Sequence, residues 1–296
     1  MTNNAPAADL DISPALVADL IAGQHPDLAG LPVVFLANGW DNALFRVGDR
    51  LVARMPRRAL GAEIIRHEQR WLPRLAPGLP IKIPYPERIG APAHGYPWPW
   101  SLTPYLPGEP AGVSDLDWAA AATATGGFLR ALHVPAPEDA PANPVRGHWV
   151  GEREESFRTN LNTAGERVDR AAALRVWSDA IAAPRHAGPP AWLHGDLHPL
   201  NILVCDGKVS AVIDFGDITS GDPATDLSVA WFLLPPEFHE TFWSAYGASA
   251  GEDGQALRTR ARGWALRLAM VFVAFSADNP LMLAIGERTL RRVLGP

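Results

Sequence analysis

The most informative stretch of this sequence is His194-Gly195-Asp196-Leu197-His198-Pro199-Leu200-Asn201, followed after a short interval by Ile213-Asp214-Phe215-Gly216. In that interval two apolar runs, residues 202–204 and 209–213, flank Asp206-Gly207, a pattern that predicts a tight hairpin. The hairpin would place Asn201 and Asp214 at its two ends, in a position to converge on one metal cluster. Asp196 lies five positions before Asn201, where it can face a substrate while Asn201 faces the metal.

This set of side chains suits phosphoryl transfer from ATP. That reaction needs divalent cations that bridge phosphate oxygens, and a group that accepts or orients the proton of the attacking hydroxyl. Magnesium prefers oxygen ligands and usually keeps several waters, so one carboxylate and one amide oxygen suffice. Asp214 and Asn201 can supply those two oxygens, which leaves Asp196 for the hydroxyl.

The same residues carry a resemblance to known families. The spacing of Asp196, Asn201 and Asp214-Phe215-Gly216 matches the catalytic loop and Asp-Phe-Gly motif of protein kinases. The His-Gly-Asp opening and Gly221-Asp222-Pro223-Ala224-Thr225-Asp226-Leu227 resemble, more specifically, the aminoglycoside phosphotransferase family of small-molecule kinases. The resemblance covers most of the chain, since residues 39–42 resemble the nucleotide-loop region of that family and residues 129–133 its Leu-x-x-Leu-His helix end.

The resemblance implies a role for each matching residue. Asp196 would be the catalytic aspartate, and Asn201 and Asp214 the magnesium ligands. His194 would shape the catalytic loop, and Asp226 would be a structural acid that braces it. ATP and Mg²⁺ are the implied cofactors, and the implied reaction is transfer of the γ-phosphate to a hydroxyl of a small molecule.

The N-terminal part of the chain offers candidates for nucleotide binding. Residues 43–47 and 51–55 predict a hairpin, and the apolar periodicity of residues 61–75 predicts a helix. Arg54 stands where kinases carry a lysine on the phosphates, and its planar fork can also bind phosphate. The alternative is an ordinary surface arginine of the strand. Glu68 is the candidate for its paired acid, with Glu63 as the alternative because the register of the helix is not fixed.

Further nucleotide contacts are expected from three residues. Asn42 belongs to the Gly39-Trp40-Asp41-Asn42 segment, which could also be a simple turn. Thr103 and Tyr105 flank Pro104 in a candidate hinge, and proline has no N–H to offer to adenine. The sequence has no Gly-x-Gly-x-x-Gly loop, which is a departure from protein kinases.

The order of predicted elements gives an α+β, protein-kinase-like fold of two lobes. Residues 77–110 are rich in proline and aromatic residues, which favours edge strands and stiff connectors. Residues 118–133 and 152–183 predict helices, and the chain is mostly helical from residue 225. We expect residues 1–105 to form a small nucleotide-binding lobe with an antiparallel sheet and one main helix, and residues 106–296 a larger helical lobe that binds the acceptor.

Composition excludes several classes of protein. The 296 residues have a net charge of −6, which argues against a nucleic-acid binder, since binding phosphates requires a basic face. No apolar run approaches the roughly 20 residues of a membrane helix, and no secretory signal is recognised. A single cysteine, Cys205, excludes an internal disulfide and fits a cytoplasmic location.

Two other interpretations remain open. His194, Asp196 and His198 alternate as in some metal-dependent hydrolases and could bind zinc, although the remaining histidines show no metal-site spacing. A pseudokinase that only binds nucleotide is the second alternative, and Arg54 is the one feature that favours it.

The acceptor is the least determined part of the prediction. The resemblance points to an aminoglycoside-like or other antibiotic, with a choline-like amine, homoserine or a sugar as metabolic alternatives. Acidic residues of the helical lobe could meet a cationic acceptor, although such charges are more often solvated: Glu152, Glu154, Glu155, Glu237 and Glu240.

Overall fold

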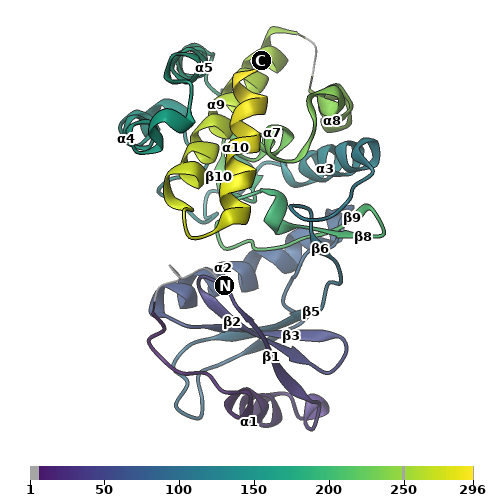
Figure 1. The fold of residues 1–296 in the computed structure, drawn as a ribbon. Coiled ribbons are helices and arrows are strands. Elements are labelled where there is room, and N and C mark those ends of the chain that lie inside the picture. Colours follow the sequence, from purple (N-terminus) through teal and green to yellow (C-terminus); the bar gives the residue numbers. More distant parts are fainter. Residues whose placement is uncertain (1–6, 249–250, 296) are drawn as a thin grey trace. The chain divides into compact units, whose positions relative to one another are not determined.

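The computed structural model describes residues 7–248 and 251–295, and these divide into two compact units. The N-terminal unit comprises the chain up to Pro77 together with Lys82–Leu106. The C-terminal unit comprises Gly78–Ile81 and the chain from Pro107 onward. Figure 1 shows the elements of each. Among the described residues, no helix is long and apolar enough to cross a membrane.

The N-terminal unit is built on a five-stranded antiparallel sheet in the order β1-β2-β3-β5-β4. Its strands are β1 (Val33–Asn38), β2 (Asn42–Val47), β3 (Leu51–Pro56), β4 (Arg88–Gly90) and β5 (Trp100–Pro104). The hairpin of β2 and β3 is therefore present as predicted. The proline-rich segment contributes the edge strand β4, but β5 lies inside the sheet. It can do so because Pro104 is its last residue and withholds no donor from its middle.

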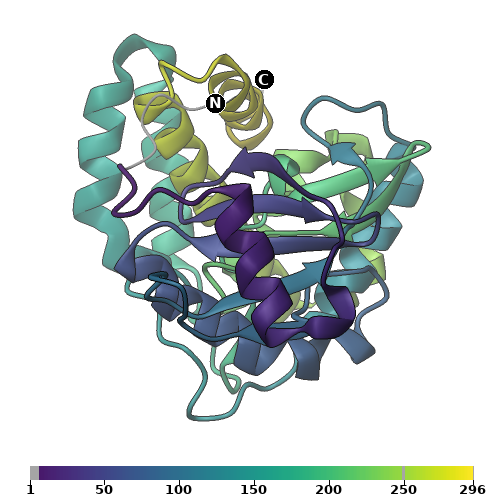
Figure 2. The ribbon, with the colours of Figure 1, turned by 90° about the horizontal axis from the view of Figure 1, so that it is seen from below.

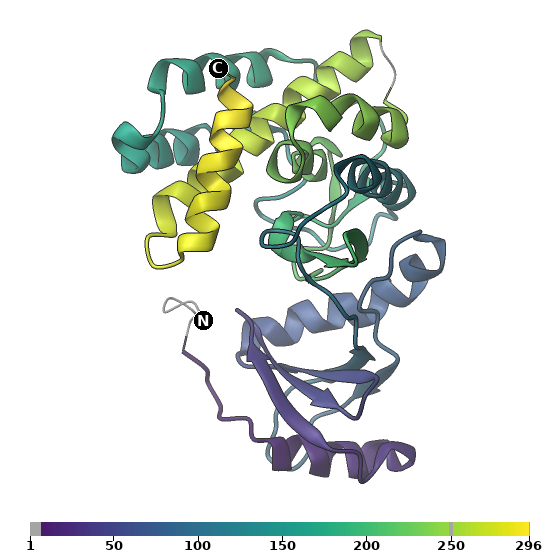
Figure 3. The same cartoon turned by 45° about the vertical axis from the view of Figure 1, so that its right-hand side comes forward.

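Two helices cover opposite faces of this sheet. They are α1 (Pro14–Gln24) and α2 (Ala59–Leu75). The hydroxyl of Ser13 accepts a hydrogen bond from the N–H of Leu16 and caps α1, which begins at Pro14. Buried Val17 and Leu20 of α1 pack into the apolar cluster that includes Phe45 of β2. Figure 2 looks onto the face that α1 covers, and Figure 3 shows α2 on the other face.

The C-terminal unit carries two small antiparallel sheets among its helices. One sheet has the order β6-β8-β9 and the other pairs β10 with β7. The strands are β6 (Glu109–Pro110), β7 (Ala191–Leu193), β8 (Ile202–Cys205), β9 (Lys208–Val212) and β10 (Thr219–Gly221). The turn between β8 and β9 is Asp206-Gly207, as predicted, with φ of 51° and 71°. These positive values are what a two-residue hairpin turn requires, and aspartate and glycine tolerate them.

The helices form the larger share of this unit, and α9 runs beside α10 in Figures 1 and 3. The helices are α3 (Trp118–Leu132), α4 (Glu154–Ala164), α5 (Arg170–Ala182), α6 (Ala224–Leu227), α7 (Val229–Leu233), α8 (His239–Tyr246), α9 (Glu252–Phe275) and α10 (Pro280–Leu294). Residues 152–183, expected to be helical, form two helices, α4 and α5, with a break between them. The helix ends at Gly165, which has φ of 59°, and Asp169 caps a new one by accepting from the N–H of Ala172 at 2.9 Å.

Candidate active site

The segment with Asp196 leaves strand β7 and turns sharply at Gly195. Gly195 has φ of 88°, and a Cβ atom there would lie 2.3 Å from the backbone oxygen of Asp217. Only glycine fits, because a side chain would meet rigid backbone in a conformation that L-residues rarely adopt. β10 pairs with β7 and so brings the chain just after Asp214 alongside this turn. We call residues 194–201 the catalytic loop.

The carboxylate of Asp226 lies beneath the start of the catalytic loop. It accepts hydrogen bonds from the backbone N–H of His194 at 2.7 Å and of Gly195 at 2.9 Å. Nε2 of His133, at the end of α3, lies 3.2 Å from the same carboxylate, and Nδ1 of His133 lies 3.0 Å from the hydroxyl of Tyr246. Burial alone would raise the pKa of Asp226, but the hydrogen bond and charge of His133 outweigh it and lower that pKa.

His194 holds the catalytic loop against the segment that contains Asp214. Its Nε2 donates to the backbone oxygen of Ile213 at 2.9 Å, and its Nδ1 accepts from the N–H of Asp196 at 3.2 Å. Both ring nitrogens are therefore occupied by backbone groups, so neither is available to a zinc ion. Among the described residues, no group of three or more His, Cys, Asp or Glu side chains could hold a metal by itself. This arrangement disfavours the zinc hydrolase interpretation.

Asn201 and Asp214 are joined through a backbone hydrogen bond. The N–H of Ile213, the residue before Asp214, donates to the backbone oxygen of Asn201 at 2.9 Å. The side-chain amide of Asn201 donates to the backbone oxygen of Asp196 at 2.9 Å, which leaves its Oδ1 without a donor among the described residues. Asp214 is exposed and has φ of 64°, a strained value for a non-glycine residue and common at functional sites.

These features fit a magnesium ion. Asn201 offers an amide oxygen that makes no hydrogen bond, and Asp214 a carboxylate with no hydrogen bond or ion pair in the described part of the chain. A hard cation takes such oxygens and fills its other positions with waters and substrate phosphates. The donor set therefore suits magnesium bound together with a nucleotide better than a site made of protein ligands alone.

Asp196 is held between a guanidinium and an imidazole. Arg146 donates to its Oδ1 at 2.5 Å, and Nε2 of His198 lies 3.4 Å from its Oδ2. Burial alone would raise the pKa of Asp196, but the charges of Arg146 and His198 outweigh burial and hold that pKa far below its ordinary value. Asp196 is thus a carboxylate at neutral pH, able to accept a hydrogen bond from a hydroxyl.

Arg146 was not identified from the sequence. It lies in the proline-rich loop after α3, where Oδ1 of Asn143 accepts from the N–H groups of Val145 and of Arg146 and so fixes the turn. The side-chain amide of Asn143 also donates to Asp217, whose other oxygen lies 3.8 Å from Nε of Arg146. No spacing rule connects residue 146 to residue 196, so only the folded chain brings them together.

In the N-terminal unit, Arg54 of β3 and Glu68 of α2 form a buried ion pair. The NH2 group of Arg54 lies 2.6 Å from Oε1 of Glu68, and the two side chains are 10% and 3% exposed. Glu68 is thus the paired acid in the structure, while Glu63 is exposed. Nε of Arg54 has no hydrogen-bond partner among the described residues. A buried arginine in an ion pair of this kind is more than a surface strand residue.

The other candidates for nucleotide binding lie on β2 and β5 or just after β5. Asn42 is buried, and its Oδ1 has no partner within the described residues. The hydroxyl of Thr103 lies 3.5 Å from the backbone oxygen of Val52. The N–H of Tyr105 donates to the backbone oxygen of Arg50 at 2.7 Å, so this N–H is already used. The guanidinium of Arg46 lies 3.3 Å from the centre of the Tyr105 ring.

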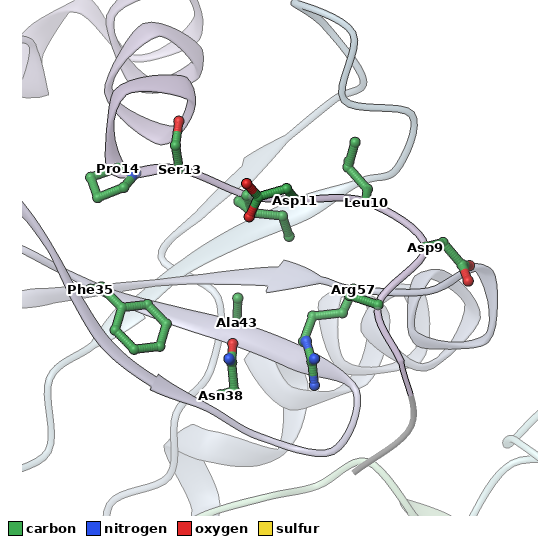
Figure 4. Close-up of a pocket in the computed structure, with 11 residues that line it drawn as sticks. Asp9, Leu10, Asp11, Ser13, Pro14, Phe35, Asn38, Ala43 and Arg57 are labelled. Atoms are coloured by element: carbon green, nitrogen blue, oxygen red, sulfur yellow. The ribbon is translucent and has the colours of Figure 1, made fainter. Parts of the chain in front are cut away.

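A pocket of the N-terminal unit lies away from these residues. It is lined by the segment before α1, by parts of β1 and β2, and by Arg57 (Figure 4). Asp9 and Asp11 lie on one side of it, and Phe35 and Asn38 on another. None of the predicted site residues lines this pocket, so we do not connect it with phosphoryl transfer.

Several carboxylates that were candidates for a cationic acceptor already have cationic neighbours. Glu154 accepts from Arg158 at 2.5 Å and from the indole of Trp177. Glu240 forms a two-pronged pair with Arg258 at 2.5 and 3.1 Å. Glu152 lies 3.4 Å from the imidazole of His148 and 3.6 Å from the guanidinium of Arg153.

Comparison with known proteins gives a match to one family model and several structures of similar fold. A model of the phosphotransferase enzyme family matches residues 32–264, whereas no curated protein sequence matches the chain. Solved structures resemble it with low identity. The GDP and kanamycin complex of APH(2")-IIia shares 19% identity over 94% of this chain and 97% of that chain, with a TM-score of 0.65.

Two further structures give the same result. Macrolide 2'-phosphotransferase MphH from Brachybacterium faecium shares 23% identity over 94% of this chain and 97% of that chain, with a TM-score of 0.63. The streptomycin–ATP–APH(2")-IIa ternary complex shares 17% identity over 94% and 95%, with a TM-score of 0.61. At such identities the likeness concerns the fold, and it confirms the predicted α+β, protein-kinase-like fold.

Proposed function

Because this chain belongs to the phosphotransferase enzyme family, we propose that it is an ATP-dependent kinase that transfers the γ-phosphate to a hydroxyl of a small molecule. The observation that carries the proposal is the arrangement of the catalytic loop. A hydrogen bond from His194 to the backbone oxygen of Ile213, and one from the N–H of Ile213 to the backbone oxygen of Asn201, fasten this loop to the segment that ends in Asp214. The side-chain amide of Asn201 bonds to Asp196 within the loop. One short piece of chain thereby presents an ionised Asp196 beside two magnesium-type ligands.

Asp196 orients the acceptor hydroxyl in this proposal. Its carboxylate accepts a hydrogen bond from the hydroxyl and aligns the oxygen with the γ-phosphorus. Phosphoryl transfer has a loose transition state in most analyses, so alignment matters more than early removal of the proton. The lowered pKa of Asp196 agrees with an orienting role, because a carboxylate so stabilised is a weak base.

The nucleotide is bound as its magnesium complex. Asn201 and Asp214 hold the cation, which when bound neutralises charge on the phosphate oxygens. Arg54 binds phosphate through N–H groups that Glu68 does not use, while Glu68 fixes the orientation of the guanidinium. Asn42 and Thr103 contribute further contacts to the nucleotide, and Tyr105 does so through its ring or hydroxyl because its N–H is taken. The exposed Cys205 suits a reducing cytoplasm, where ATP is abundant.

The acceptor is first to be sought among antibiotics. The named complexes contain kanamycin and streptomycin, and a macrolide kinase has the same fold. A metabolic acceptor, such as an amine, homoserine or a sugar, is the second candidate. It is favoured by one observation, namely that Glu154 and Glu240, which could have met a polycationic antibiotic, are paired with arginines.

The test is acceptor-stimulated conversion of ATP to ADP across a panel of aminoglycosides, macrolides, amines and sugars. At least one acceptor should stimulate turnover by the wild type. Asp196→Asn should lower that turnover by about 10²- to 10⁴-fold, the usual contribution of a group that handles the proton. ATP binding should persist in this variant, because Asp196 is not among the proposed ligands of the nucleotide.

The matched control is Asp206→Asn. Asp206 lies in the exposed hairpin turn near the catalytic loop, and asparagine tolerates its positive φ. This variant should keep wild-type turnover. Near-normal turnover in a folded Asp196→Asn protein would refute the assignment of Asp196. A wild-type protein that binds ATP but phosphorylates no acceptor would favour the pseudokinase interpretation.

A further inference from the structure

Arg267, in the second half of α9, is a buried cation without a counterion. It is 7% exposed, and no hydrogen bond or ion pair to it is found among the described residues. The guanidinium carbon of Arg267 lies 5.4 Å from the centre of the Trp264 ring. A buried charge is strongly unfavourable unless it is paired, so a site of this kind points to an anion that binds there.

The surroundings of Arg267 are rich in donors and poor in acceptors. Gly263 packs closely against Ala180 of α5 and less closely against Val150 of the 3₁₀ turn η3 (Val150–Arg153), and Arg267 follows one helical turn later on the same face. Nε of Arg153 at the end of this turn and the indole N–H of Trp264 are also buried without a hydrogen-bond partner among the described residues. Three neighbouring side chains thus have buried donors that no protein oxygen satisfies.

Helix α9 reaches the catalytic loop, since the ring of Phe272 lies 5.3 Å from that of His198, and the η3 turn that ends in Arg153 contacts α9. Burial, together with the charges of Arg146 and Arg153, lowers the pKa of Arg267 to about 10. Arg267 remains charged at neutral pH. Asp196 and Asp217 offset the charge of Arg146, and Glu152 offsets that of Arg153. Arg267 is the cation that remains uncompensated.

We propose that Arg267, with Arg153 and the indole N–H of Trp264, forms a subsite for an anionic group of the acceptor, a carboxylate or a phosphate. This proposal rests on the proposed function, since it places the acceptor hydroxyl at Asp196 and the anionic group at Arg267. The subsite would repel a polycationic antibiotic from the same position, because like charges in a poorly solvated environment interact unfavourably. The substrate class is therefore a hydroxy acid or a hydroxyalkyl phosphate.

The subsite can be tested without catalysis by thermal unfolding of the full chain. Inorganic phosphate and malonate serve as probes, each titrated against sodium chloride of equal ionic strength. Both anions also stabilise proteins non-specifically, so the readout is the difference between variants. The Tm of the wild type should rise with probe concentration more than that of Arg267→Met. A larger response to malonate would assign a carboxylate, and a larger response to phosphate a phosphate group.

Arg258→Met is the matched control. Arg258 lies on the same helix and pairs with Glu240 at the surface. Its replacement by methionine removes the same charge as Arg267→Met does. Its Tm response should equal that of the wild type. Without any probe, Arg267→Met should be as stable as the wild type or more so, because an apolar residue replaces an unpaired buried charge. A large loss of stability in Arg267→Met, or equal responses to both probes in wild type and Arg267→Met, would overturn the subsite.

Turnover separates this inference from the proposed function. Glycerate and glycerol 3-phosphate are compared with glycerol, and homoserine with 3-aminopropan-1-ol. Acidic acceptors should be preferred, and Arg267→Met should lower their kcat/KM by about 10- to 150-fold, the equivalent of one charged hydrogen bond, without affecting the uncharged ones. If only cationic or neutral acceptors react and Arg267→Met leaves their kcat/KM unchanged, the subsite is refuted while the proposal of a kinase is supported. If anions bind in a way that depends on Arg267 but no acceptor is phosphorylated, the anion subsite is supported and the proposal of a kinase is refuted.

Discussion

Replacing Asp226 with asparagine would remove the one carboxylate that holds the start of the catalytic loop. Asp226 is 1% exposed and accepts from two successive backbone N–H groups, those of His194 and Gly195, and from Nε2 of His133. Asparagine has nearly the same shape but only one acceptor oxygen. Its NH2 group would face a backbone N–H or the imidazole, so at least one buried donor would be left without an acceptor.

The expected loss of stability follows from this count. Breaking a buried charged arrangement by removing one partner typically destabilises a protein by about 3–5 kcal/mol. For a domain of about 150–250 residues, each kcal/mol of lost stability lowers Tm by about 2–4 °C, so the Tm of Asp226→Asn should be roughly 6–20 °C lower than that of the wild type. Turnover should fall as well, because Asp196 directly follows the two backbone groups that Asp226 holds. Displacement of a reacting group by about 1 Å can lower a rate by about 10²-fold.

The assay is thermal unfolding of both proteins, followed by helical circular dichroism, with turnover measured well below the lower Tm. Glu240→Gln is the control, because its carboxylate is exposed and its pair with Arg258 should contribute at most about 1 kcal/mol. A double-mutant cycle with His133→Gln isolates the part due to the imidazole. A stability change below about 1 kcal/mol for Asp226→Asn would refute the bracing role.

The pH dependence provides a second check on Asp226. The pKa of Asp226 is lowered in the folded state. Its ionised form therefore stabilises the fold fully at pH values above the ordinary carboxyl pKa of about 4. This stabilisation is lost as the pH falls through the lowered pKa of the folded state. Asp226→Asn has no such titration. The stability difference between the two proteins should be constant from about pH 5 to 8 and should shrink in acid. A difference that grows in acid would contradict the direction of the shift.

Two further predictions concern the nucleotide. Arg54→Ala should lower kcat/KM for ATP by about 10- to 150-fold, the equivalent of one charged hydrogen bond. Arg54→Lys should fall between wild type and alanine, because lysine keeps the charge but lacks the planar guanidinium. Steady-state kinetics with varied ATP checks this, and equal kcat/KM for wild type and Arg54→Ala would mean that the phosphate contact lies elsewhere. In calorimetric titrations, Asp214→Ala should abolish the magnesium dependence of ATP binding and Asn201→Ala should weaken it, since each residue is proposed to supply an oxygen to the cation. Unchanged magnesium dependence in both variants would contradict the proposed metal site.

The parts of the structure that the sequence predicts correctly are those fixed by neighbouring residues. Asp206-Gly207 predicts its hairpin because both residues tolerate positive φ, and Ser13-Pro14 predicts the start of α1 because cap and proline act locally. The break at Gly165 is missed because the apolar periodicity continues on both sides of it. The interior position of β5 is missed because the proline content of its surroundings suggests an edge.

The residues of the candidate site also fall into those that neighbouring sequence identifies and those that only the fold brings together. Asp196, Asn201 and Asp214 lie within one stretch whose spacing carries the pattern, and their chemical roles stay predictions. Arg146 and His133 lie far from that stretch in the sequence and reach it only through the fold. For His133 a signal existed, since it ends the Leu-x-x-Leu-His segment. For Arg146 and Arg267 there was none, because neither the ion pair of Arg146 with Asp196 nor the exposure of only 7% for Arg267 can be inferred from sequence neighbours.

The position of Arg146 links acceptor recognition to the state of Asp196. Its guanidinium bonds to Asp196 and adds to the positive charge around Arg267. An anionic acceptor bound at Arg267 would offset part of that charge, whereas a cationic acceptor would add to it. Asp196 stays ionised beside Arg146, and it orients the acceptor hydroxyl without having to become a stronger base. The arginines of this unit thus favour an acidic acceptor through binding, while Arg146 keeps Asp196 in the state that aligns the hydroxyl.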